Sequence, residues 1–128
     1  MTASAKQIEA VLKLPPQKRY SHFIKKVVGW RKMWGLYDGG WAMSETKDGS
    51  PVFPLWPERE YAERCIDGDW AKYEPRAIDL DDALDNMLPM LRQRGIEPGV
   101  FFSPDRGSID VHIDQLERDL RSELLKYR

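Results

Sequence analysis

The sequence predicts a single α+β domain with a mostly antiparallel sheet packed with about five helices, and three observations support this. Segments typical of strands and of helices come in blocks rather than in strict alternation, which favours an antiparallel sheet. The length of 128 residues is close to the usual size of one domain. Hydrophobic residues make up 41% of the chain and aromatic residues 11%, a composition typical of a folded domain.

Residues 1–30 are expected to form a basic helical hairpin. Ile8, Val11 and Leu12 share one face of a first helix, which the two prolines at 15 and 16 end. A second helix follows to about residue 28. Its apolar stripe recurs at three- and four-residue spacing: Tyr20, Phe23, Ile24, Val27 and Val28.

Residues 33–56 are expected to form a three-stranded antiparallel meander. Its strands are expected at 33–37, 41–46 and 51–56. Glycines in the turns 38–40 and 48–49 supply the positive φ that tight hairpins need. Pro51 and Pro54 cannot donate ladder hydrogen bonds, so the third strand is expected at an edge or beside a bulge.

Residues 57–95 are expected to be mainly helical. A helix from Pro57 to about residue 66 should bury Tyr61 and Cys65, and a short strand is expected around 76–78. Asp79 should cap the next helix, which Pro89 should kink and Gly95 should end.

Residues 97–128 are expected to form a second hairpin and a closing helix. The hairpin strands are expected around 100–102 and 109–113, with His112 on the solvent face. Asp114 and Glu117 resemble a capping box. The apolar face of the last helix would carry Leu116, Leu120, Leu124 and Tyr127.

The sequence carries no recognisable catalytic or metal-binding motif. Its two histidines and single cysteine cannot build a close-spaced zinc cluster. The acidic run from Asp79 to Asp85 lacks the ligand spacing of a calcium loop, and helix capping explains it. No nucleophile elbow or phosphate loop occurs. We therefore expect no catalytic residue, no metal and no cofactor. The sequence leaves open whether the protein is an enzyme, but it favours a protein that is not.

Several features of the sequence favour a cytoplasmic location. The single Cys65 excludes an internal disulfide, and no apolar run approaches the roughly 20 residues of a membrane span. The first residues lack the apolar stretch of a signal peptide.

Charge is divided unevenly along the chain. Residues 1–32 carry eight Lys or Arg against Glu9 alone, although the net charge is −1. One interpretation is a contact surface for an anionic partner, formed by Lys18, Arg19, Lys25 and Lys26. The other, which we favour, is a basic hairpin packed beside an acidic body, because nucleic-acid modules are usually basic overall.

An aromatic cluster between residues 30 and 73 is the most informative feature. A Trp-rich core explains it most simply, because Trp concentrates both in cores and at binding sites. The functional hypothesis is that some rings form a face that binds a ligand or partner. Its candidate residues are Trp34, Trp41, Trp56, Tyr61 and Trp70.

Several local patterns resemble a bacterial family known as domain of unknown function 2750. They lie between residues 7 and 126. The residues that carry the resemblance are Arg19-Tyr20 with Phe23-Ile24-Lys25-Lys26-Val27, Trp34-Gly35-Leu36, Gly40-Trp41, Pro54-Leu55-Trp56-Pro57, Tyr61-Ala62, Trp70, Pro75 with Ile78-Asp79-Leu80, and Val100-Phe101. The resemblance implies a small cytoplasmic bacterial protein, and it brings no reaction, cofactor or catalytic residue.

These observations favour a non-catalytic interaction or regulatory module with a protein partner. The sequence also leaves open whether the protein forms a homo-oligomer. One alternative is a small-molecule binder or enzyme with an aromatic pocket near Trp41, Trp56 and Tyr61, where Glu58, Arg59 or Glu60 would supply polar contacts. A further alternative is nucleic-acid binding through the basic N-terminal helices.

Overall fold

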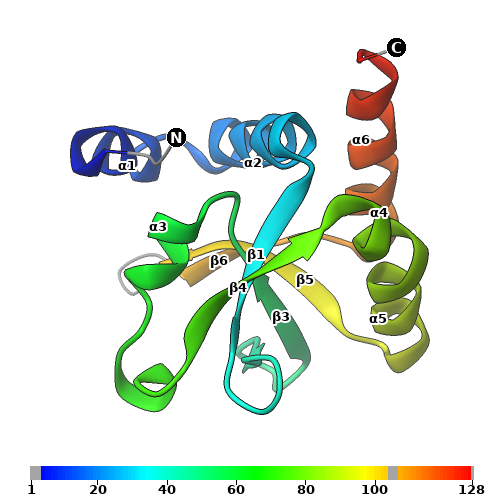
Figure 1. The fold of residues 1–128 in the computed structure, drawn as a ribbon. Coiled ribbons are helices and arrows are strands. Elements are labelled where there is room, and N and C mark those ends of the chain that lie inside the picture. The colour runs from blue at the N-terminus through cyan, green and yellow to red at the C-terminus, as the bar shows by residue number, and fades with distance from the viewer. Residues whose placement is uncertain (1–3, 104–106, 128) are drawn as a thin grey trace.

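The computed structural model describes residues 4–103 and 107–127 and has an α+β fold with two sheets (Figure 1). In the smaller sheet, β1 (Lys32–Tyr37) pairs antiparallel with β4 (Glu74–Asp79). The larger sheet has the order β2 (Ser44–Glu45), β3 (Pro51–Leu55), β5 (Glu97–Ser103) and β6 (Gly107–Asp110). The predicted α+β class is confirmed. The prediction of a mostly antiparallel sheet is confirmed only in part, because β3 and β5 are parallel.

Helices cover the strands on several sides (Figure 1). Their bounds are α1 (Ala5–Leu12), α2 (Pro16–Trp30), α3 (Arg59–Glu63), the 3₁₀ turn η1 (Gly68–Trp70), α4 (Leu80–Asp82), the π-helical turn η2 (Ala83–Met87), α5 (Leu88–Arg94) and α6 (Ile113–Leu125). The first two lie along one side of the strands, and α5 and α6 stand together at one end. No helix in the described part of the chain has both the length and the apolarity to cross a membrane.

The predicted three-stranded meander is wrong. The glycine turn after β1 does bring Trp41 opposite Tyr37, and the Ala42 amide donates to the Leu36 carbonyl over 2.8 Å. The chain then turns away, and β1 pairs along its whole length with β4 instead. The second turn is as predicted: Gly49 has φ 88° and β2 forms an antiparallel hairpin with β3.

Strand β3 lies between β2 and β5, not at an edge, and this corrects the prediction from its prolines. Backbone groups two residues apart along a strand point the same way. The Trp56 amide donates to the Trp34 carbonyl on β1, so Pro54 faces that side as well. The two residues of β2 pair only with Pro51 and Val52. No residue of β2 therefore lies opposite Pro54, and the missing N–H of this proline costs no hydrogen bond to β2.

The helix after β4 begins and ends where the sequence predicts. The Asp79 carboxylate accepts from the Asp82 amide over 3.2 Å, and Gly95 ends α5 with φ 70°. Pro89 has no N–H to continue an α-helical ladder. The wider π turn η2 comes immediately before its helix α5, and this turn accommodates the proline where the sequence predicts a kink.

The start of α6 differs from the predicted capping box. His112 lies outside β6 and caps the helix, with its Nδ1 accepting from the Asp114 amide over 3.2 Å. Glu117 instead accepts hydrogen bonds from Arg92 at 2.6 Å and from Arg121 at 2.9 Å. Its carboxylate therefore joins α5 to α6 rather than capping a helix.

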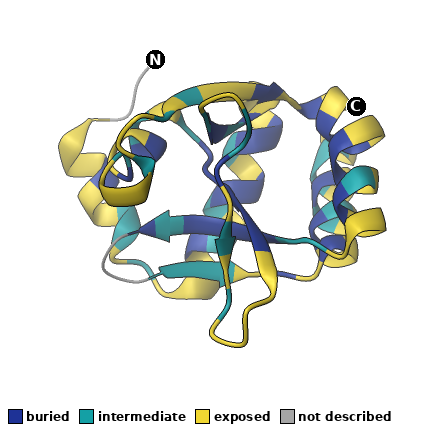
Figure 2. Cartoon of the chain, turned by 90° about the horizontal axis from the view of Figure 1, so that it is seen from below, coloured by how far each residue is buried: buried dark blue, intermediate teal, exposed yellow. Residues whose placement is uncertain are grey.

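The two sheets meet at a pair of tryptophans. The Trp34 amide donates to the Trp56 carbonyl over 2.8 Å, and the Trp56 amide donates back over 2.9 Å. Buried residues run through the central strands and along the inner sides of the helices (Figure 2). The largest side chains of this core include Trp56, Phe23 and Phe101, none of which has any exposed surface.

The fold requires glycine at position 35, because the space that a side chain would occupy is filled. A Cβ there would lie 2.9 Å from two ring atoms of Trp41, so the indole ring packs directly on the backbone of β1. The same ring makes an edge contact with Tyr37 at 5.0 Å between centroids.

We predict that Gly35→Ala lowers the free energy of unfolding by about 1–3 kcal/mol, because the added methyl group displaces the Trp41 ring. Urea denaturation measures the change. Gly40→Ala is the matched control, because a Cβ there would meet no atom within 4 Å. Adding Trp41→Leu should reduce the effect of Gly35→Ala. Equal stability of the two single glycine variants would contradict this packing.

Candidate functional site

Two of the five aromatic candidates, Trp56 and Tyr61, lie in the core. They are 0% and 3% exposed. The Trp56 indole Nε1 donates to the Phe102 carbonyl over 2.8 Å, and Tyr61 makes an edge contact with Phe101 at 5.0 Å between centroids. The structure therefore does not bring Trp41, Trp56 and Tyr61 together as the lining of a pocket.

The remaining three aromatic candidates are half-buried and lie apart. Trp41 packs between Gly35, Tyr37 and Phe53. Trp34 lines a small hollow near α3, whereas Trp70 lines a larger groove beside η1. Trp34 and Trp70 thus lie on two separate surfaces, and each surface has its own chemistry.

The first surface, which we call the Trp30 surface, comprises Lys25, Lys26, Trp30, Lys32, Trp34 and Tyr127. Trp30 separates two shallow hollows of about 200 and 360 Å³ and lines both. It is 46% exposed, and Tyr127 is 62% exposed. Tyr127 reaches across α2, because a Cβ at Gly29 would lie 3.7 Å from its hydroxyl oxygen.

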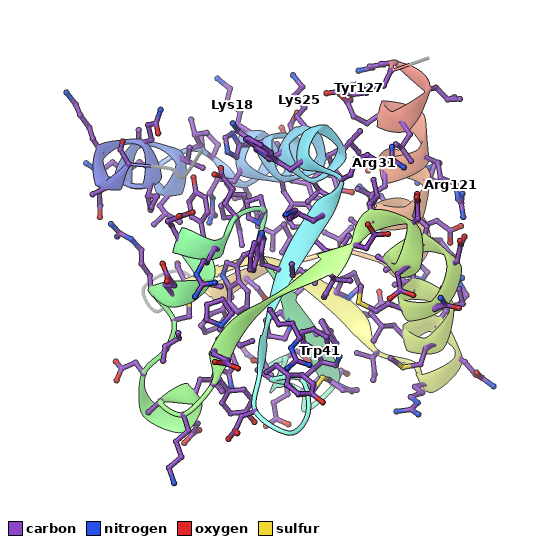
Figure 3. All side chains as sticks on the ribbon, viewed as in Figure 1. Lys18, Lys25, Arg31, Trp41, Arg121 and Tyr127 are labelled. Atoms are coloured by element: carbon purple, nitrogen blue, oxygen red, sulfur yellow. The ribbon has the colours of Figure 1, made fainter. Side chains whose placement is uncertain are left out.

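Lysines lie around these rings, and two glutamates lie at one end of the surface. Lys18 and Lys25 point outward from α2, and Tyr127 lies at the end of α6 (Figure 3). Within the described residues, Lys25, Lys26 and Lys32 make no ion pair, whereas nearby Arg31 pairs with Asp81 over 2.9 Å. At the far end Arg59 lies over the Trp34 ring, 5.9 Å from its centroid, beside Glu58 and Glu60.

The basic residues proposed from the sequence do not all lie on this face. Lys18 and Lys25 are exposed and Lys26 is half-buried. Arg19 is only 5% exposed, and its Nε donates to the Leu14 carbonyl over 3.1 Å. This hydrogen bond closes the turn between α1 and α2, so the structure gives Arg19 a role inside the hairpin.

The second surface, the Trp70 groove, has a volume of about 640 Å³ and comprises Met43, Glu45, Asp67, Asp69, Trp70 and Phe102, together with Ser44, Cys65 and Gly68. Contacts with buried groups hold the aromatic side chains of this groove in place. Trp70 makes edge contacts with Trp56 and Phe102, at 6.3 and 5.1 Å between centroids. The Phe102 carbonyl accepts from both Trp56 Nε1 and Cys65 Sγ.

Titratable groups near these surfaces are perturbed mainly by burial, not by catalytic pairing. Burial raises the pKa of the Cys65 thiol to about 11, so it stays protonated at neutral pH. Burial, and then the hydrogen bond to Asp119, raises the pKa of Tyr20, which donates over 2.7 Å and ties α2 to α6. Burial also raises the pKa of Glu58. Among the described residues no cluster of three metal-ligating side chains occurs.

Comparison with known families assigns the chain. The model of the family described as "Protein of unknown function (DUF2750)" matches residues 20–120. The chain belongs to this family. No curated protein matches it. Membership confirms the family that the sequence resembles, and the matched range includes both Trp30 and the Trp70 groove.

Two important residues of the Trp30 surface were not among the sequence candidates. Trp30 follows the apolar stripe of α2 by two residues, which is the signal that its ring could lie outside the buried face. Tyr127 fits the apolar spacing of α6 but lies beyond its last residue, Leu125, where the helix no longer packs on the core.

His22 offers a pH test of the α2 packing. Its Nε2 is buried without a hydrogen-bond partner in the described part of the chain, and its ring packs against Phe101 at 6.0 Å between centroids. Burial, and then the charge of Lys26, lowers its pKa below the usual value of 6.5.

We predict that the folded state loses stability as pH falls below about 6.5. His22 of the unfolded chain binds a proton in this range, whereas the lowered pKa of His22 in the folded chain disfavours protonation. Urea titrations between about pH 7.5 and 5.5 measure this slope. His22→Phe, which keeps the ring contact, should flatten it. Lys26→Gln should reduce it, because the folded-state pKa of His22 rises. A slope that His22→Phe leaves unchanged would refute this origin.

Proposed function

We propose that this domain is a non-catalytic interaction module that binds an acidic segment of a partner protein through the Trp30 surface. The observation that carries this proposal is the joint exposure of Trp30 and Tyr127 among lysines that have no ion pair within the described residues.

The two exposed rings favour a protein partner. A soluble domain gains stability by burying Trp, yet Trp30 has nearly half of its surface in contact with solvent. Trp, Tyr and Arg are the residue types that most often dominate protein–protein binding energy. The shallow hollows on either side of Trp30 would accept apolar side chains of a docked segment.

The charge of the surface favours an acidic segment. Lys25, Lys26 and Lys32 surround the rings, and none of them makes an ion pair within the described residues. Carboxylates of a partner would supply the missing anions and speed the encounter through long-range attraction.

The absence of catalytic geometry in the described residues also favours binding over chemistry. Cys65 is a buried, protonated thiol that donates to backbone carbonyls, and Tyr61 is a core residue. Glu58 has a raised pKa, but it lies near Glu60, Lys26 and Arg59 without a nucleophile among the residues lining its hollow.

Single-stranded nucleic acid is the second candidate, because exposed rings beside lysines can also stack bases. We rank it lower. Glu58 and Glu60 close one end of the Trp30 surface and would repel a phosphate backbone that runs across both hollows, whereas a short acidic segment can end at Lys25, Lys26 and Lys32. The net charge of the whole chain is −1, which does not favour a polyanion.

A quantitative capture experiment tests the proposal. The tagged wild-type domain should retain a host protein stoichiometrically, and Trp30→Ala should weaken its binding about 30-fold, because a central Trp typically contributes about 2 kcal/mol or more. The paired variant K25E/K26E should also weaken capture, because it replaces two cations of the surface by carboxylates. Both changes alter exposed or half-buried positions, so circular dichroism should show an unchanged fold.

Two controls make the outcome decisive. Met43→Ala removes an exposed apolar side chain from the Trp70 groove, and K47E/K72E reverses two lysines outside both surfaces. Capture should survive both controls. Equal loss in the controls, or full capture by Trp30→Ala, would overturn the proposal. Capture that nuclease treatment abolishes would replace it with nucleic-acid binding.

A further inference from the structure

The Trp70 groove has the opposite character to the Trp30 surface and calls for a different ligand. Of the side chains that the structure describes along it, three are carboxylic acids and none is cationic. Glu45 comes from β2, whereas Asp67 and Asp69 come from the turn at η1. Carboxylates therefore reach the same groove from two elements that are far apart in sequence.

The other large side chains that line the groove are apolar. Met43 is 39% exposed, and Trp70 and Phe102 are half-buried with their rings 5.1 Å apart between centroids. The groove volume of about 640 Å³ is within the usual range for small-molecule sites, roughly 300–1,000 Å³. Its size and lining suit a small molecule with a hydrocarbon part.

The groove is held in shape before any ligand arrives. Asp67 accepts from the Gly68 amide over 2.8 Å, which fixes one carboxylate at the start of η1. Trp70 is held by its edge contact with Trp56, and Phe102 by the hydrogen bond from Trp56 to its carbonyl. A site whose wall is already ordered loses less conformational entropy on binding.

We infer that the Trp70 groove binds a small organic dication, an aliphatic diamine in free form. Its two ammonium groups would pair with carboxylates from β2 and η1, and its methylene chain would lie on Met43, Trp70 and Phe102. An aromatic wall attracts ammonium groups as well as hydrocarbon. This inference does not depend on the proposed function, which uses a separate surface.

Isothermal titration calorimetry with three probes of matched length tests the inference. The probes are 1,4-diaminobutane, 1-aminobutane and butane-1,4-diol. The diamine should bind one-to-one, the monoamine about threefold more weakly, because one exposed ion pair is lost, and the diol should show no saturable binding. The Trp70 indole N–H signal in an NMR spectrum should shift with the diamine and not with the diol.

A neutralised groove provides the matched variant. E45Q/D67N/D69N keeps the size of each side chain, and the amide oxygen introduced by D67N would still accept from the Gly68 amide. This variant should weaken diamine binding roughly tenfold. The control D38N/E74Q/D85N removes the same number of charges from exposed positions outside the groove and should retain wild-type affinity.

Three outcomes would overturn the inference. The first is equal affinity for the diamine and the diol. The second is an equal loss in the control variant, which would mean that only the overall charge matters. The third is a diamine titration that moves the Trp30 indole signal and leaves Trp70 unchanged. A combined shift at Trp70, loss in the groove variant and retention in the control supports it.

Discussion

The structure depends on the joint between its two sheets at Trp34 and Trp56. Two backbone hydrogen bonds between these residues connect the β1–β4 pair to β3, and through β3 to the mixed sheet. The Trp56 side chain extends this joint, because its ring has no exposed surface and its Nε1 donates to the Phe102 carbonyl. Trp56 thus connects β1 of the smaller sheet with β3 and the end of β5 of the larger sheet.

This joint explains how the aromatic cluster is divided. Trp56, Tyr61 and Phe101 form its buried part, and Trp41 covers the backbone at Gly35. Trp34 and Trp70 each reach outward from the joint, toward opposite kinds of surface. The hollow at Trp34 has both cations and carboxylates, with the lysines of α2 beside the neighbouring hollow, whereas only carboxylates among charged groups line the groove at Trp70. The uneven charge along the sequence therefore becomes two chemically distinct surfaces.

Local patterns in the sequence predicted the parts of the fold that local interactions decide. The apolar stripe of α2, the cap at Asp79 and the turn at Gly49 needed only residues within a few positions. The pairing of β1 with β4 and of β3 with β5 joins segments about 40 residues apart, and turn chemistry does not encode it. Local patterns could not predict which aromatic side chains reach the surface, because burial of Trp56 and exposure of Trp30 depend on which strands and helices meet.

Hydrogen exchange of the five Trp indole N–H groups, followed by NMR in deuterated water, tests the central claim most directly. The account predicts that the Trp56 signal persists longest, because that N–H is buried and hydrogen-bonded to Phe102. The Trp30 signal should vanish first, because its ring is 46% exposed. Exchange of Trp56 as fast as that of Trp30 would contradict both the joint between the sheets and the division of the aromatic cluster.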